Sequence, residues 1–478
     1  MVIVLKIISY QKATSRMTPS SIVQSIIATI TRFPLSALCS LMCSALVCSA
    51  LLIGRIPYKI SLIGILCIGF SWFISLTLHV ENAKSRTKPS SRWHFAGGSV
   101  LFLVLAIYLY KSPPSFQVFF ALNLAAFLSI LIAPFVGQSA TTAHIKWFQY
   151  NIWKQLVLTI FTAGLLYLIA LLTSFSLNFL FESNANWVLL ITNLILTPGC
   201  PLITTLVCPF LGMSGIPNRF DVKPKAYPEL LRRMLQYIAV PFFFIYSIIL
   251  YIYVGKILIA GSLPKGHVAD IVCAFGTFGL GTYIFSYPFH DMATIFTLFR
   301  KHFFKILSIP LLLLAVGIAT RVSEFGITGS RYLVLMFLIW FTLCTGFSFL
   351  KKEGQENKLI FLSLIALIVL SSVGPLQMEK VCEWSQIHRL KTLLIKNQML
   401  VEGKIHKSTA KLNTKDADNI QSIVKYLVRT EKVKSLEELF PNTLEDPKDP
   451  KKTPLTVKKI LHELGITPAK KGSDPYKP

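Results

Sequence analysis

About eleven apolar runs constrain this chain more than any other feature, because each is close to the length a helix needs to cross a bilayer. Lipid offers the backbone no hydrogen bonds, so only helices or closed barrels can cross it. Barrel strands would alternate apolar and polar residues, whereas these runs are apolar throughout. The sequence therefore predicts an all-α fold, a polytopic transmembrane helical bundle of about 11 spans followed by a small helical extramembrane domain. The predicted spans are Phe33–Gly54, Ile60–His79, Phe95–Tyr110, Val118–Val136, Leu156–Phe179, Trp187–Leu211, Leu235–Val254, Ala269–Tyr287, Phe304–Ala319, Leu333–Leu350 and Leu359–Val373.

Composition supports a membrane protein. Of the 478 residues, 53% are hydrophobic and 15% are charged, against about a quarter charged in an ordinary soluble domain. The formal net charge of +26 is typical of proteins that meet nucleic acid or a charged membrane surface. The membrane is the simpler explanation, because orientation alone requires Lys and Arg in cytoplasmic loops. We therefore expect the lipid bilayer as a partner and no nucleic acid.

The distribution of Lys and Arg predicts the orientation. With the N-terminus in the cytoplasm, inner segments hold about 21 of these residues and outer loops about 7. An odd number of spans then places everything after Pro375 outside, which in a bacterial inner membrane is the periplasm. One span more or fewer would reverse this side.

Three parts are predicted. Residues 1–32 form a cytoplasmic segment, 33–375 the transmembrane bundle, and 376–478 a soluble helical domain. Pro19–Arg32 has apolar residues at helical spacing and reads either as an amphipathic helix on the inner membrane face or as an extension of the first span.

The C-terminal part, residues 376–478, has helix signals. Ser385–Met399 and Asp416–Arg429 carry apolar residues at helical spacing, and a capping box begins at Ser435. Pro454 suits a first helical turn and Gly465 a C-cap. The predicted buried faces are Ile387, Leu390, Leu393 and Leu394 on the first helix and Ile420, Ile423, Val424 and Leu427 on the second.

A polar stretch, "SEFGITGSRYLVL" from Ser323 to Leu335, separates two apolar runs. One interpretation is a loop with glycines for the reversal, Thr328 as a helix cap, and Arg331 and Tyr332 as interface anchors. The other is a functional charged cluster facing a cavity, since ionisable groups at membrane depth are functional candidates. The residues of this candidate cluster are Arg321, Glu324, Gly326, Thr328, Arg331 and Tyr332, joined from the C-terminal part by Gln386 and Arg389.

"FGITGSRYLVL" resembles the YGxTxxRY signature of a bacterial integral membrane family called domain of unknown function 4153. Ala226–Gly266 is similar to that family's run from a span into a Leu-Pro-x-Gly turn, and Ser371–Leu394 to its Gly-Pro and Ser-Gln-x-x-Arg-Leu block. Phe325 departs from the signature tyrosine. The resemblance covers roughly the second half of the chain and implies a bacterial inner-membrane protein, but no activity.

The contact between these blocks is a specific prediction. The resemblance marks Gln386 and Arg389 as part of a family pattern, and both are predicted on the same side of the membrane as the Gly326–Arg331 loop. We expect both side chains to hydrogen-bond to that loop. The alternative is a self-contained helix whose Arg389 is solvated.

Catalytic motifs are absent from the sequence. It holds no phosphate loop, GxGxxG or HExxH, and its nine cysteines form no CxxC pair. His267 with Asp270 and His290 with Asp291 lie at opposite ends of one predicted span and read as interface residues. We expect no catalytic residue, no metal, no cofactor and no enzyme activity.

The sixth predicted span holds "LTPGCPLITTLVCP". Pro198, Gly199 and Pro201 predict either a mere kink or a broken helix of the kind that exposes backbone to ligands in transporters.

Two functions follow. The first is a non-enzymatic envelope protein that displays a basic periplasmic helical domain to anionic lipid head groups, cell-wall polymer or another envelope protein. The second is a transporter or permease for a small solute. A membrane-embedded transferase is a third possibility without a specific signal.

Overall fold

The structure is a computed structural model of the whole chain. It describes residues 19–53, 57–84, 91–136, 142–180, 191–193, 195, 199–217, 227–261, 268–350, 356–401, 404–406, 413–430, 436, 439–440 and 453–466. The chain forms two compact units. Unit 1 comprises residues 1–228 and 357–369, and unit 2 comprises residues 229–356 and 370–478. Helix α16 (Glu356–Ser372) contributes to both units.

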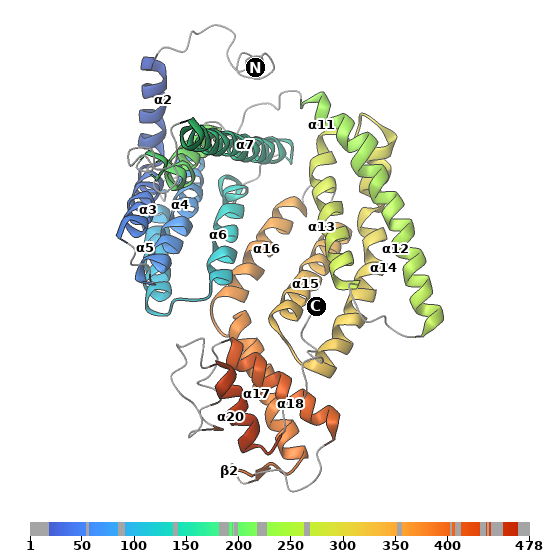
Figure 1. The fold of residues 1–478 in the computed structure, drawn as a ribbon. Coiled ribbons are helices and arrows are strands. Elements are labelled where there is room, and N and C mark those ends of the chain that lie inside the picture. Colours follow the sequence, from blue (N-terminus) through green and yellow to red (C-terminus); the bar gives the residue numbers. More distant parts are fainter. Residues whose placement is uncertain are drawn as a thin grey trace. The chain divides into compact units, whose positions relative to one another are not determined.

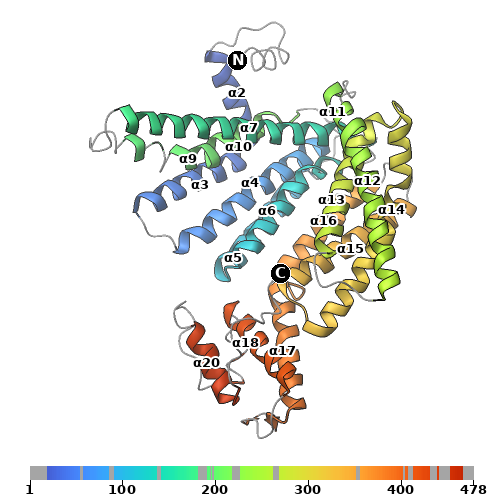
Figure 2. The ribbon, with the colours of Figure 1, turned by 45° about the vertical axis from the view of Figure 1, so that its right-hand side comes forward.

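Unit 1 is built around helix α4, which packs on α3, α5 and α6. The long helix α7 crosses α4 and α6 instead of running alongside them (Figures 1 and 2). Its elements are α2 (Pro19–Arg32), α3 (Pro34–Ile53), α4 (Pro57–Lys84), α5 (Ser91–Lys111), α6 (Phe116–Ile130), the 3-10 turn η1 (Ala133–Phe135), α7 (Thr142–Leu180), α9 (Cys200–Leu202), the π-helical η3 (Ile203–Val207) and α10 (Cys208–Ser214).

One arginine side chain, that of Arg32, joins three segments of unit 1. Arg32, the last residue of α2, donates from Nε and Nη2 to the two carboxylate oxygens of Glu81 on α4, at 2.9 and 2.8 Å. The same guanidinium donates to the carbonyls of Ile216 and Pro217, both at 2.9 Å, just beyond the end of α10. One planar side chain with five N–H donors thereby joins three segments.

Unit 2 packs its long helices around phenylalanines. Phe243 of α12 is fully buried and stacks on Phe275 of α13 with ring centroids 4.7 Å apart. Gly279 lets the rings of Phe243 and Phe303 approach α13 closely. The membrane-like elements of this unit are α11 (Glu229–Met234), the π-helical η4 (Leu235–Ala239), α12 (Val240–Ala260), α13 (Val268–Ser286), the 3-10 turn η5 (Tyr287–Phe289), α14 (Thr294–Phe325) and α15 (Gly329–Leu350).

A proline lies inside α14 without ending it. Pro310 has no N–H, so the carbonyl of Ile306 loses its usual helical donor. The hydroxyl of Tyr251 on α12 donates to that carbonyl at 2.9 Å. A neighbouring helix therefore supplies the hydrogen bond that the proline removes.

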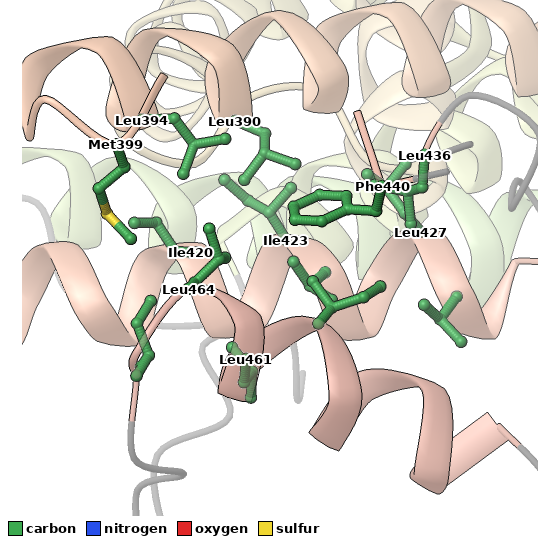
Figure 3. Close-up of a cluster of buried hydrophobic side chains, with 14 residues drawn as sticks. Leu390, Leu394, Met399, Ile420, Ile423, Leu427, Leu436, Phe440, Leu461 and Leu464 are labelled. Atoms are coloured by element: carbon green, nitrogen blue, oxygen red, sulfur yellow. The ribbon is translucent and has the colours of Figure 1, made fainter. Parts of the chain in front are cut away.

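The C-terminal part has its own core, made by α17 (Met378–Lys396), α18 (Thr414–Arg429) and α20 (Thr453–Glu463), with the short antiparallel pair β1 (Leu400–Val401) and β2 (Lys404–Ile405). Figure 3 shows leucine, isoleucine and phenylalanine side chains meeting between the helices. Gly465 ends α20 with φ of +72°, and the Ile466 N–H reaches back to the Leu461 carbonyl at 2.8 Å. This is the glycine-terminated helix end that the sequence predicts.

The predicted fold class is confirmed: in the described residues the fold is all-α apart from the two-residue pair β1–β2, which sequence reasoning missed. Eight described helices are long and apolar enough to cross a membrane by length and composition. Shorter apolar helices occupy Phe116–Ile130, Cys200–Ser214 and Lys358–Ser372, so each predicted span overlaps an apolar helix.

Several boundaries differ from the prediction. Helix α7 has 39 residues, about 58 Å, and begins at Thr142, whereas the predicted span Leu156–Phe179 would be about 36 Å long. Helix α17 begins at Met378, seven positions before the predicted Ser385. The helix expected at Pro19–Arg32 is confirmed as α2, and the predicted buried faces of α17 and α18 are confirmed. The capping box at Ser435 lies outside the described residues, and the three-part domain division stays a prediction.

Neighbouring residues of α17 provide a matched test of the C-terminal core. Leu394 is fully buried in it, whereas Ile395 is 60% exposed. We expect Leu394→Ala to destabilise this core by about 2–5 kcal/mol, and Ile395→Ala by under about 0.5 kcal/mol. Hydrogen-exchange protection of the α18 amides in the full-length protein measures both. Equal losses of protection would contradict the assignment of Leu394 to the core.

The first turn of α18 predicts a pH dependence. Asp416 is buried there and accepts from Lys396 Nζ at 2.9 Å, and this ammonium lowers the pKa of the carboxyl below its ordinary value. A carboxyl with a lowered native pKa stabilises the fold above its unfolded pKa, and this contribution is lost as the pH falls through the native pKa. We expect protection factors of α18 to fall below about pH 4 and to fall less in Asp416→Asn. An identical acid response in wild type and variant would contradict this.

Candidate functional site

The turn between α14 and α15 requires glycine. Gly326 has φ of +68° and ψ of −178°, a conformation that is essentially confined to glycine. A Cβ at this position would also lie 2.8 Å from Nε2 of Gln386 and 3.2 Å from Oγ of Ser385. The reversal therefore needs glycine for both its backbone and its neighbours.

Two polar residues of α17 hold this turn. The fully buried Gln386 donates from Nε2 to the carbonyls of Phe325 at 3.1 Å and Ile327 at 3.0 Å. Ser385 Oγ accepts the N–H of Ile327 at 2.9 Å. We call this group, Phe325–Ile327 with Ser385 and Gln386, the joint, because it fastens the first helix of the C-terminal part to the α14–α15 turn.

Further contacts surround the joint. Arg331 donates from Nη1 to the carbonyls of Gly326 at 3.1 Å and Phe325 at 3.3 Å, and its guanidinium lies 5.2 Å from the Phe325 ring centroid. The buried Tyr332 donates its hydroxyl to the carbonyl of Leu376 at 2.6 Å. The first turn of α15 is thus tied both to the turn before it and to the chain just before α17.

The expected contact of Gln386 with the Gly326–Arg331 loop is confirmed. Arg389 was expected to hydrogen-bond to the same loop, but the acceptor differs. Its Nη2 donates to Oδ1 of Asn419 on α18 at 3.0 Å. Its guanidinium meets the turn through the Phe325 ring, at 5.8 Å from the centroid. Arg389 therefore links the joint to the second helix of the C-terminal part.

The remaining members of the predicted cluster take no part in the hydrogen bonds of the joint described above. Arg321 and Glu324 are exposed on the last turns of α14. Thr328 is buried directly before α15, and its carbonyl accepts the Tyr332 N–H at 2.8 Å. The structure thus brings Gly326, Arg331 and Gln386 together as a hydrogen-bonded unit.

The segment of unit 1 that the sequence predicts as either a kink or a broken helix is continuous from Gly199 onward. Pro198 lies outside the described residues. Gly199 and Pro201 have helical backbone, and the helix continues through the π-helical η3 into α10. The expected interruption takes the form of a widened turn.

Neighbouring helices satisfy the oxygens around this widened turn. Pro209 removes a donor from the carbonyl of Thr205, and Ser40 Oγ of α3 donates to it at 2.5 Å. Tyr167 donates its hydroxyl to the Cys200 carbonyl at 2.8 Å, and Gln155 Nε2 donates to the Leu211 carbonyl at 2.7 Å. Polar side chains of α3 and α7 thereby hold the segment in its helical form.

A cavity of about 390 Å³ lies beside this segment, between α4, α6, α7 and α10. Its lining is mainly apolar and includes Phe70, Ile74, Phe127, Ile152, Ile160 and Met213. The volume falls in the range of small-molecule sites. The sequence did not predict it, because its walls come from four helices whose crossing is not encoded in any one apolar pattern.

Chemistry-bearing side chains elsewhere have structural partners. His290 pairs with Asp291 at 3.0 Å and its Nδ1 lies 2.9 Å from the Tyr287 carbonyl, whereas His267 is outside the described residues. Burial raises the pKa of the Cys382 thiol to about 11, so at neutral pH it carries little thiolate. Among the residues that the structure describes, no group of three or more His, Cys, Asp or Glu has metal-ligand geometry.

Comparison with known proteins gives one informative relative. The chain is 27% identical over 288 residues to the uncharacterized protein PM1469 of Pasteurella multocida (strain Pm70), a match that covers 60% of this chain and 47% of the relative. The chain thus matches less than half the length of that protein. No known family model and no solved structure matches. The resemblance to domain of unknown function 4153 stays a prediction.

Two glycines of the turn provide a matched test of the joint. Gly326→Ala places a methyl group against Gln386 in a strained conformation, so we expect a loss of about 1–3 kcal/mol or more. Gly329→Ala meets nothing within 4 Å and has no positive φ, so it should be close to neutral. Thermal unfolding and hydrogen exchange of α17 in detergent-solubilised protein measure both. Similar effects of the two variants would contradict the geometry of the joint.

Proposed function

We propose that this chain is a non-enzymatic protein of a bacterial inner membrane. It holds a basic helical domain in a fixed orientation at the periplasmic face of that membrane. The apolar helices support insertion in a membrane. The relative in Pasteurella multocida supports a bacterial setting. The excess of Lys and Arg in one set of loops supports a cytoplasmic N-terminus and a periplasmic C-terminal domain.

The joint is the observation that carries the proposal. A domain that only needed attachment would be served by a flexible linker. Here the fully buried Gln386 donates from Nε2 to two carbonyls of the α14–α15 turn, and the Tyr332 hydroxyl donates to the carbonyl of Leu376. Such contacts restrict the orientation of α17 relative to α14 and α15. Fixed orientation is useful when the domain must meet a partner at a defined height and angle.

The proposed partners are anionic. Lys415, Lys425 and Arg429 are exposed on α18, on the side of the helix that its buried apolar face leaves free. Exposed cations at a membrane surface attract anionic lipid head groups and acidic polymers. Cell-wall polymer or another envelope protein with an acidic surface would meet the same residues.

A transporter or permease is the second candidate, because the π-helical η3 lies beside the cavity of unit 1. π-Helical turns occur frequently at functional sites. The mainly apolar lining suits an apolar solute better than an ion or a sugar.

The orientation is tested by fusing reporters after Pro478. We expect alkaline phosphatase, which is active only in the periplasm, to be active there, and green fluorescent protein exported by the same route to remain dark. The same reporters after Arg32 should give the opposite pattern, because that position is proposed to be cytoplasmic. A fluorescent C-terminal fusion would overturn the periplasmic assignment.

The role of fixed orientation is tested by complementation in a strain that lacks the gene. Truncation after Pro375 should insert in the membrane but fail to complement, and Gly326→Ala should fail while Gly329→Ala complements. Full complementation by the truncated protein would overturn the proposed function. If Gly326→Ala complements but the truncated protein does not, the C-terminal domain is needed for function and the joint is not. That result would overturn the proposed role of fixed orientation.

A further inference from the structure

The cavity of unit 1 is open to the surface of the unit and holds about 390 Å³. This volume falls in the range of small-molecule sites. Water is a poor occupant, because each molecule needs two to four polar partners and the walls are mainly apolar. A ligand with an apolar body fits the lining.

The opening of the cavity faces an apolar surface. Ile160 of α7 lines the cavity and is 62% exposed, and its neighbours Val157 and Phe161 are also exposed. Thr204 of η3 lines the cavity and is exposed on the opposing side. An occupant therefore enters past α7, from the surroundings that the apolar surface of α7 meets. If α7 lies in a membrane, these surroundings are lipid chains.

One residue that lines the cavity carries a buried hydroxyl without a hydrogen-bond partner. Thr159 is 8% exposed, lines the cavity, and its hydroxyl makes no hydrogen bond. Thr162 and Thr173 of the same helix donate to the carbonyls four residues before them, at 2.8 Å each. A buried hydroxyl without a partner costs free energy, and rotation of the Thr159 side chain toward the cavity would let a ligand oxygen accept its hydrogen bond.

We propose that this cavity binds one acyl chain of a membrane phospholipid, with the hydroxyl of Thr159 donating to an oxygen of the ligand, such as its ester carbonyl. The apolar lining holds the chain, the exposed side of the lining at Ile160 and Thr204 admits it, and Thr159 is the polar contact. The site lies in unit 1 and is independent of the proposed display of the C-terminal domain.

The probe is a phosphatidylglycerol with a photoactivatable diazirine in the middle of one acyl chain. Full-length protein is reconstituted in phosphatidylcholine nanodiscs that contain this lipid, irradiated, digested and mapped by mass spectrometry. Lipid around the protein labels exposed residues such as Ile259, which is 91% exposed. Labelling of Met213 and Ile152, which line the cavity and are buried, requires a chain inside it.

Two glycines again supply a matched pair. Gly212 lines the cavity, and a Cβ there would meet nothing within 4 Å, so Gly212→Leu fills the space; Ala163→Leu is a second filling variant. Gly164 has equally open space but is not part of the lining, so Gly164→Leu is the control. We expect filling to reduce labelling of Met213 at least about tenfold relative to Ile259, and the control to leave it unchanged. Thr159→Val should reduce it about two- to tenfold.

Background labelling of Met213 in wild type, or equal labelling in wild type and both filling variants, would overturn the site. Unchanged labelling in Thr159→Val would overturn the role of the hydroxyl. A free fatty acid with the same diazirine provides the comparison of ligand source. Labelling of Met213 by the free acid alone would overturn the assignment to phospholipid.

Discussion

Main-chain carbonyls that lose their helical donor need another one, because an apolar interior offers no water in its place. Both units meet this need in the same way. A serine hydroxyl of α3 donates to the carbonyl that Pro209 frees in unit 1, and a tyrosine hydroxyl of α12 donates to the one that Pro310 frees in unit 2. Prolines can therefore remain inside these apolar helices without breaking them, and each freed oxygen becomes a point of attachment between two helices.

The joint uses the same device at a change of chain direction. The turn at Gly326 places the carbonyls of Phe325 and Ile327 where no helix can satisfy both. A primary amide carries two N–H donors on one nitrogen, so the single side chain of Gln386 serves both oxygens. A glutamine that would be costly to bury alone thereby becomes the most specific contact between α17 and the helices before it.

Sequence reasoning succeeded where a local period decides the outcome. Helical spacing predicted that Leu390 and Ile423 lie in the C-terminal core, and the glycine in the turn was predicted from its conformational freedom. It failed where a partner comes from a distant segment. Arg389 bonds to Asn419, 30 positions away, and no spacing rule connects the two. The same limit applies at η3. A proline in the sequence indicates that a helical hydrogen bond is lost, but it does not indicate that the Ser40 hydroxyl of another helix replaces that bond.

Against this background, an unpartnered hydroxyl identifies where the fold has not completed its own hydrogen bonding. Among described residues, buried side-chain atoms of Ser36, Gln149 and Ser174 also lack partners, but none of these residues lines the described cavity. Thr159 combines the two features on one helix, an unsatisfied donor and an empty space of ligand size beside it. Gln155 and Tyr167 of the same helix donate to the Leu211 and Cys200 carbonyls, so the α7 wall of the cavity is hydrogen-bonded to the segment that carries the widened turn.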